Sequence, residues 1–334
     1  MSSRRGDKTF ELFSGIPPGF IVDYWSGRNG IRDFTAEVKR RTMKHDPKII
    51  LKPGRSLRLK DFDPKYTGAF KDRKAAKEKL AGDISRMALL QDKLYAENRS
   101  ALLIIFQAMD AAGKDSTIKH VMSGINPQGC QVVSFKQPST LELSHDFLWR
   151  TTQCLPQRGM IGIFNRSYYE EVLISRVHPE LVLKQNLPGI RRLEDIPASL
   201  WETRFAQINH FEKMLIENGT RIVKFFLHVS KHEQKKRFLE RIENPEKNWK
   251  IAMADVQERA CWGSYQKAYE EALSRTSTGL APWYIIPADN KWFMRTAVSD
   301  IIVRTLKEFN SDYPAMSGAK VSELARIKRM LLKD

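Results

Sequence analysis

The sequence has few of the features that mark disulfide-rich, zinc-binding or membrane proteins. Its three cysteines, Cys130, Cys154 and Cys261, are odd in number and far apart, so they indicate neither a disulfide framework nor a CxxC metal site. The histidines show no HExxH or similarly paired zinc-ligand spacing. No run approaches the roughly 18 apolar residues that a membrane span needs. The N-terminus also lacks an apolar signal core, and we therefore expect a cytoplasmic protein.

Acidic residues are also scarce relative to basic ones. The 334 residues include 56 Lys and Arg against 39 Asp and Glu, which gives a net charge of +17 and a pI near 9.7. Such an excess favours a polyanionic partner: nucleic acid, an anionic membrane surface or a phosphate-rich substrate. The alternative is a basic surface that serves only solubility.

Turn-forming segments such as "GIPPGF" and "LKPG" dominate the first part of the chain. Between positions 32 and 79 there are 16 Lys and Arg against 7 Asp and Glu. We therefore predict an irregular basic N-terminal extension at residues 1–72. The rest of the chain, 73–334, is predicted to be one folded domain that starts with a long helix, because Leu80, Ile84, Met87 and Leu94 follow helical spacing.

Apolar strands and helical segments alternate after this helix. Strands are predicted at 101–106, 130–135, 160–164, 221–229 and 283–287. Helices are predicted between and after them at 114–124, 141–153, 167–177, 201–217, 232–243, 254–274, 291–309 and 321–333. Continuous apolar strands separated by helices indicate a parallel sheet that is covered on both faces. We expect an α/β protein with three α/β/α layers.

The first strand leads directly into "AMDAAGKDS", residues 108–116, and a helix. The phosphate-binding pattern GxxxxGK[ST] is matched except that Ala108 replaces the first Gly and Asp115 the hydroxyl residue, with Ser116 one place later. Gly113 lets the backbone approach an anion, and Lys114 supplies an ammonium group for phosphates. The alternative is an ordinary strand–turn–helix connection. The predicted phosphate-binding residues of this loop are Ala111, Ala112, Gly113, Lys114, Asp115 and Ser116.

Asp110 is a carboxylate inside the predicted phosphate loop. It would repel a bound phosphate unless a cation lay between the two. A second motif, "GIFNRSYYEEVL", ends its strand at Asn165 and Arg166, where P-loop enzymes usually place an acid. Because Asn165 is neutral, we predict that Asp110 supplies the carboxylate for Mg²⁺. Asn165 and Arg166 are predicted to bind polyphosphate or the nucleotide, and Asp110, Lys114 and Arg166 are predicted to be catalytic. For Glu170 and Glu171, periodicity alone gives a solvated helix face.

A third basic segment, residues 231–260, is predicted to be a mobile helical lid. Arg237 and Arg241 share one helix face, the helix breaks at "NP", and Lys250 follows. In nucleotide kinases such a flap covers the phosphates. We expect the two arginines to be an exposed pair that contributes little to folding. The alternative is an ordinary basic surface helix.

Together the segments "QAMDAAGKDS", "FNRSYYEEVL", "FLERIENPEKNWK" and "TSTGLAPWYIIPADNKWFMR" resemble the polyphosphate kinase 2 family, over residues 75–309. The resemblance implies a P-loop kinase fold, a reversible Mg²⁺-dependent phosphoryl transfer between inorganic polyphosphate and nucleotides, and frequent oligomerisation. It also implies that Asp110 is the metal-linked acid, that Lys114 and Arg166 bind phosphates, and that Arg237 and Arg241 belong to the lid.

The motif departs from many members of this family by reading Asn-Arg-Ser-Tyr-Tyr-Glu from Asn165 to Glu170. This version resembles the subgroup that accepts nucleoside monophosphates as well as diphosphates, and it makes Glu170 a candidate catalytic residue. We therefore expect AMP or ADP as the acceptor, with guanine nucleotides as an alternative, and Mg²⁺ or Mn²⁺ as the metal. We expect the chain to assemble with further copies of itself, and we expect it to bind neither nucleic acid nor membranes.

Two other functions remain open from the sequence. A thymidylate-kinase-like enzyme with ATP as the phosphoryl donor would share the fold but would not need the large positive charge. A basic P-loop protein that binds RNA or DNA would use the charge, but the chain has no aromatic-rich basic sheet motif and no RGG-type tail.

Overall fold

The computed structural model describes residues 48–68, 70 and 72–333. Five strands form its one described sheet: β1 Ala101–Gln107, β2 Cys130–Ser134, β3 Ile161–Asn165, β4 Thr220–His228 and β5 Trp283–Pro287. Their order across the sheet is β2-β3-β1-β4-β5, and every neighbouring pair is parallel. The predicted α/β fold with a parallel sheet is confirmed, and each strand lies within one residue of its predicted bounds.

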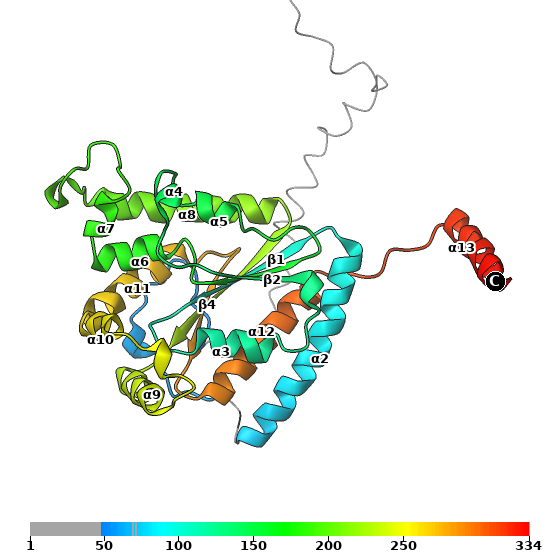
Figure 1. Cartoon of the computed structure of the whole chain (residues 1–334), viewed down its shortest axis with the longest axis horizontal. Coiled ribbons are helices and arrows are strands. Elements are labelled where there is room, and N and C mark those ends of the chain that lie inside the picture. Colours follow the sequence, from blue (N-terminus) through cyan, green and yellow to red (C-terminus); the bar gives the residue numbers. More distant parts are fainter. Residues whose placement is uncertain (1–47, 69, 71, 334) are drawn as a thin grey trace, which may run out of the picture. The chain divides into compact units, whose positions relative to one another are not determined.

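Helices cover both faces of the sheet (Figure 1). One face carries α2 Arg73–Glu97, α3 Lys114–Val121 and α12 Lys291–Glu308, and the other carries α6 Glu170–Val177, α8 Ser199–Glu217 and α11 Trp262–Thr276. All seven residues of β1 are buried, because this central strand is covered from both sides. The predicted three-layer arrangement is therefore confirmed.

The remaining elements complete the described part of the chain. They are η1 Leu59–Asp61, η2 Pro127–Gly129, α4 Thr140–Leu143, α5 Trp149–Thr152, α7 Glu180–Leu183, η3 Leu193–Asp195, α9 Lys231–Glu243, η4 Asn248–Lys250, α10 Met253–Ala260 and α13 Gly318–Leu331.

Two predicted helices are interrupted in the structure. The prediction of one helix over 141–153 is wrong, because this segment forms two short helices, α4 and α5. In the turn between them, Asp146 Oδ1 accepts a hydrogen bond from Leu148 N at 2.9 Å. Such a local bond from an Asp side chain competes with helical hydrogen bonding. The helix predicted over 254–274 is divided at Cys261 between α10 and α11.

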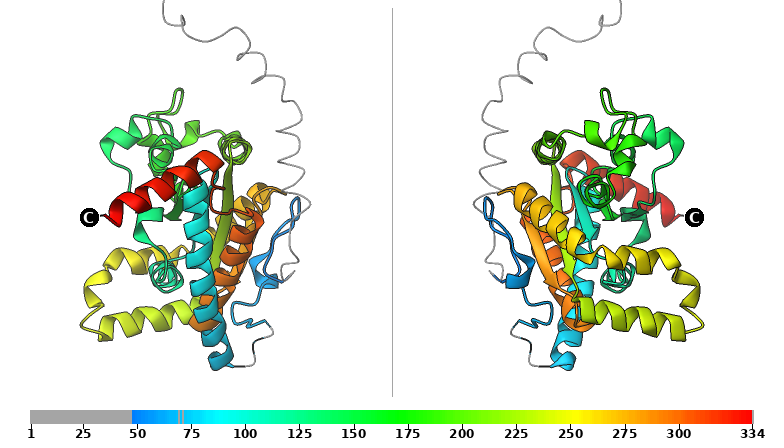
Figure 2. Two further views of the ribbon diagram at one scale, coloured as in Figure 1. Left: turned by 90° about the vertical axis from the view of Figure 1, so that its right-hand side faces the viewer. Right: turned by 90° about the vertical axis from the view of Figure 1, so that its left-hand side faces the viewer.

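The segment from Lys48 to Tyr66 packs against the β5 edge of the sheet, as Figure 2 shows for the blue part of the chain. Ile50 forms an antiparallel bridge with Tyr284, and Leu51 N donates to Trp283 O at 2.9 Å. The earlier part of the predicted extension, 1–47, lies outside the described residues. In the part of the chain that is described, no helix has both the length and the apolar character needed to cross a membrane.

Candidate active site

The loop between β1 and α3 has the backbone geometry of an anion-binding turn. Parallel strands place their carboxyl ends at one edge, so this loop lies beside the residues that follow β3. Gly113 has φ 109°, and a Cβ there would lie 3.3 Å from Met294 Cε, so glycine relieves both strain and crowding. Ala111 has φ 59°, which is strained for alanine. The tight loop forms although Ala108 replaces the usual glycine.

The ammonium of Lys114, the first residue of α3, is buried against this loop. Its Nζ donates to the carbonyl oxygen of Ala108 at 2.8 Å, and the residue is only 9% exposed. Burial lowers the pKa of Lys114, and the nearby Arg166 lowers it further. The carboxylates of Asp110, Glu170 and Asp115 raise this pKa in opposition. Lys114 is therefore a desolvated cation at the base of the predicted phosphate site.

Asp110 and Arg166 are brought together from two neighbouring strands. Arg166 Nη2 lies 2.9 Å from Asp110 Oδ1, and both side chains are about one-third exposed. Arg166 has φ 64°, an unfavourable conformation that turns the chain sharply after β3. Glu170 first, and Asp110 after it, raise the pKa of Arg166. The pair thus forms a charged group with solvent access next to Lys114.

Glu170 belongs to this group rather than to a solvated helix face. It is half-buried at the start of α6, and burial raises its pKa, whereas Arg166 and Lys114 lower it. The default expectation of a solvated face is wrong for Glu171, which is 5% exposed and accepts a hydrogen bond from Gln185 at 2.6 Å. Of these two neighbouring residues, Glu170 is the one whose carboxylate acts on Lys114 and Arg166.

The second carboxylate of the loop has a neutral partner. Asn165 Nδ2 donates to Asp115 Oδ1 at 2.7 Å, so the strand-end amide fixes the exposed acid at the start of α3. Ser116 Oγ accepts a hydrogen bond from Arg295 Nη2 at 2.7 Å. Arg295 was not predicted as a site residue, although it closes the last of the four segments that resemble the polyphosphate kinase 2 family.

Arg237 lies behind the loop, and the expectation that it is exposed is wrong. It is 5% exposed, and its Nη1 donates to the carbonyl oxygens of Ala111 at 3.2 Å and Ala112 at 2.6 Å. Its Nη2 donates to Ala288 O at 2.5 Å, and its Nε pairs with Glu233 at 2.9 Å. The guanidinium therefore braces the two loop carbonyls, and its role in a lid stays a prediction.

The other predicted lid residues are not in contact with the loop. Arg241 is half-buried and stacks on Phe238 at 5.6 Å, while Lys250 is exposed beside Trp249 at 4.9 Å. With the described residues, neither side chain forms a hydrogen bond or an ion pair. Gln234, which was not predicted, reaches the loop instead and donates from Nε2 to Asp110 O at 2.9 Å.

Two cavities meet at Arg166 and Glu170. One, of about 210 Å³, is lined by Asp110 and by residues of α9, α10 and α11, and the other, of about 330 Å³, extends along α6 toward Arg150 and Lys136. Both include Glu258, which accepts hydrogen bonds at its carboxylate. Charged groups thus stand between two spaces, as a transfer between two bound substrates requires.

Known proteins resemble the chain over most of its length. The family model described as "Polyphosphate kinase 2 (PPK2)" matches residues 70–314. The ADP-polyphosphate phosphotransferase of Rhodopseudomonas palustris is 51% identical over 280 residues, which are 84% of this chain and 96% of that protein. The AMP/ADP-polyphosphate phosphotransferase of Meiothermus ruber is 46% identical over 268 residues, 80% of this chain and 95% of that protein. The crystal structure of polyphosphate kinase 2 from Arthrobacter aurescens has a TM-score of 0.76 and 40% identity, covering 85% of this chain and 96% of that one.

Proposed function

The chain belongs to the polyphosphate kinase 2 family, and on this premise we propose that it transfers the terminal phosphoryl group of inorganic polyphosphate reversibly to AMP and ADP. The observation that carries the proposal is the convergence of Lys114, Asp110, Arg166 and Glu170 at the carboxyl ends of β1 and β3, between two cavities. The names of the two similar phosphotransferases support polyphosphate as the donor and both nucleotides as acceptors.

The reaction needs positive charge more than it needs a base. An acceptor phosphate is already anionic, so its oxygen attacks the terminal phosphorus of polyphosphate without losing a proton. The bridging bond between that phosphorus and the rest of the chain breaks, and polyphosphate shorter by one phosphate leaves. Lys114 and Arg166 would bind the oxygens on which charge develops, in exchange for their present contacts with Ala108 and Asp110. Arg237 holds the carbonyl oxygens of Ala111 and Ala112 on its own side of the loop. The backbone N–H groups of the loop would therefore face the bound phosphates.

The acidic residues fit a metal ion that is shared with the substrates. Among the described residues no group of three or more His, Cys, Asp and Glu side chains is arranged to hold an ion alone. Mg²⁺ typically uses one or two carboxylates together with substrate phosphates, and Asp110 is a partly exposed carboxylate beside the phosphate loop. Asp110 would hold Mg²⁺, or alternatively Mn²⁺, and the ion would neutralise phosphate charge.

Further parts of the proposal rest on the sequence and the family. We propose adenine nucleotides as acceptors, with guanine nucleotides as an alternative, a cytoplasmic location and a homo-oligomeric enzyme. Residues 231–260 would act as the lid, with Arg241 and Lys250 moving toward the phosphates on closure. The net charge of +17 suits a polyanionic donor, and rising salt should weaken its binding.

One assay tests the proposed donor against the two alternatives. The purified chain is given Mg²⁺, AMP or ADP, and either polyphosphate or ATP as the only donor. We expect product only with polyphosphate when AMP is the acceptor. Lys114→Ala should remove this activity, whereas Lys119→Ala, an exposed lysine of the same helix, should retain it. Transfer from ATP alone would identify an ATP-dependent kinase, and no transfer with binding of RNA or DNA would identify a nucleic-acid-binding protein.

A further inference from the structure

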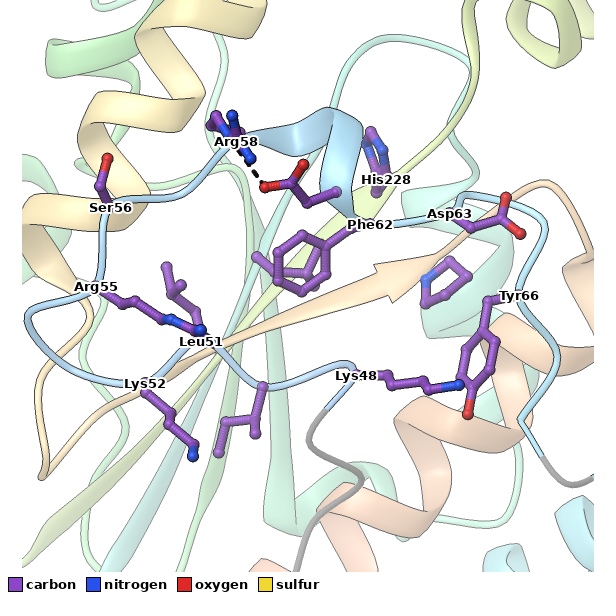
Figure 3. Close-up of a pocket in the computed structure, with 14 residues that line it drawn as sticks. Lys48, Leu51, Lys52, Arg55, Ser56, Arg58, Phe62, Asp63, Tyr66 and His228 are labelled. Carbon is purple, nitrogen blue, oxygen red and sulfur yellow. Dashed lines mark hydrogen bonds and ion pairs between the residues drawn. The ribbon is translucent and has the colours of Figure 1, made fainter.

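A third cavity, which has no residue of the phosphate loop in its lining, lies along the β5 edge of the sheet. Its volume is about 770 Å³, within the range of cavities that bind small ligands. Figure 3 shows its wall, which is formed mainly by the segment from Lys48 to Tyr66, with His228 at the end of β4. None of its lining residues lines either cavity at Arg166 and Glu170.

The segment that forms this wall is fixed by buried leucines and by backbone hydrogen bonds to α11. Leu51, Leu57 and Leu59 are each at most 3% exposed. Leu57 N donates to Ser274 Oγ at 2.8 Å and Leu59 N to Glu270 Oε1 at 2.7 Å. The polar side chains between these leucines are therefore presented at fixed positions, as a binding site requires.

Cations line the outer part of this cavity. The lining includes four cations, Lys48, Lys52, Arg55 and Arg58, and two acids, Asp61 and Asp63. Arg58 pairs with Asp61 at 3.0 Å, and Asp63 Oδ1 accepts a hydrogen bond from Lys65 N at 2.9 Å. With the described residues Lys52 and Arg55 form no ion pair, so their charges are available to an anionic ligand.

The inner part of the cavity is apolar and aromatic. Phe62 and Tyr66 line it together with Ile50, Ile285 and Pro287. His228 is 7% exposed, and its Nδ1 has no hydrogen-bond partner among the described residues.

We propose that this cavity binds a nucleoside phosphate, with the phosphates at Lys52 and Arg55 and the base between Phe62, the apolar floor and His228. Bare polyphosphate suits it less, because a uniformly charged chain gains nothing from an apolar, aromatic floor. The proposal rests on the cavity alone and stands whether or not the chain transfers phosphate.

The test isolates this cavity from the phosphate loop. In a Lys114→Ala chain, equilibrium dialysis with ATP should detect one bound nucleotide. Adding Lys52→Glu and Arg55→Glu should weaken this binding by about tenfold or more, since two cations become anions. Adding Lys60→Glu and Lys65→Glu instead, which change exposed residues of the same segment outside the cavity, should leave it intact.

Competition separates a nucleotide site from a simple phosphate site. Tripolyphosphate should displace ATP from the Lys114→Ala chain much less effectively than unlabelled ATP does. Equal displacement would show that the base is not recognised and would overturn the proposal. Loss of ATP binding in the Lys114→Ala chain, or equal effects of the two double substitutions, would overturn it as well.

Discussion

Arg237 donates a hydrogen bond from Nη1 to the main-chain oxygen of Ala112 at 2.6 Å, across 125 positions of the sequence. The same guanidinium donates from Nη2 to Ala288 O at 2.5 Å and to Asp289 O at 3.2 Å. One buried side chain thus joins the phosphate loop to the turn after β5. Carbonyl oxygens that are held in this way cannot rotate toward a bound phosphate. A phosphate would therefore be bound by the backbone N–H groups of the loop.

Arg237→Ala should therefore destabilise the protein as well as reduce its activity. Carbonyl oxygens at the loop and at Ala288 would lose their partner while they remain buried, at a cost of about 2–4 kcal/mol. We expect a melting temperature several degrees lower, measured by calorimetry, together with a higher KM for the phosphate donor.

Arg241→Ala is the matched control, because Arg241 lies one helical turn later, stacks on Phe238 and forms no hydrogen bond or ion pair with the described residues. It should change stability by no more than about 0.5 kcal/mol. Equal changes in the melting temperature of the two variants would contradict the bracing role of Arg237.

The central strand β1 was predictable because its buried residues form a continuous apolar run, 101–106, in the sequence. The loop and the strand-end pair Asn165 and Arg166 were also predictable, since the topology of a parallel sheet brings them to one edge. The burial of the Arg237 side chain behind the loop could not be predicted. Its hydrogen-bond acceptors are main-chain oxygens, and these leave no signal in the sequence. The burial of Glu171 depends likewise on distant partners, Gln185 and Arg204 of α8.

Asp110→Asn should keep the fold and remove most of the activity. The amide still accepts a hydrogen bond from Arg166 but provides no negative charge for a metal ion. A loss on the order of 10³-fold in kcat is expected. The measurement is turnover as a function of Mg²⁺ concentration, with circular dichroism as the check on folding. Near-normal turnover at limiting Mg²⁺ would show that Asp110 is not the metal carboxylate.

A buried ion pair supports the start of α6 from below. Lys224 Nζ lies 2.7 Å from Glu212 Oε2 and donates a hydrogen bond to Tyr169 Oη at 3.0 Å. Tyr169 immediately precedes Glu170 in the sequence. Lys224→Met should cost about 3–5 kcal/mol, because it leaves the Glu212 carboxylate buried without its cation. Adding Glu212→Gln should restore part of the loss in chemical denaturation. A double variant as unstable as the sum of the single ones would exclude this coupling.

The raised pKa of Glu170 predicts a pH-dependent gain in stability on its removal. Above its ordinary pKa of 4.5, the unfolded chain has lost this proton while the folded chain still retains it. Stability therefore falls as the pH rises from 4.5 toward the folded pKa, and Glu170→Gln removes this penalty. The melting temperature of Glu170→Gln should exceed that of the parent chain at pH 7, and the difference should shrink toward pH 4.5. A constant difference across this range would contradict the prediction.

Glu170→Asn tests whether this carboxylate selects the acceptor. Glu170 lies in the wall shared by the two cavities at Arg166, where an acceptor phosphate would meet the donor. AMP has one phosphate fewer than ADP and reaches less far, so an additional carboxylate that holds a second Mg²⁺ or a water would position it. We expect Glu170→Asn to reduce kcat/KM for AMP about tenfold more than that for ADP, in steady-state kinetics at fixed polyphosphate and Mg²⁺. ADP serves as the internal control for folding and for donor binding. Parallel losses with both acceptors would assign Glu170 to phosphoryl transfer in general, and no loss with either would show that neither acceptor depends on it.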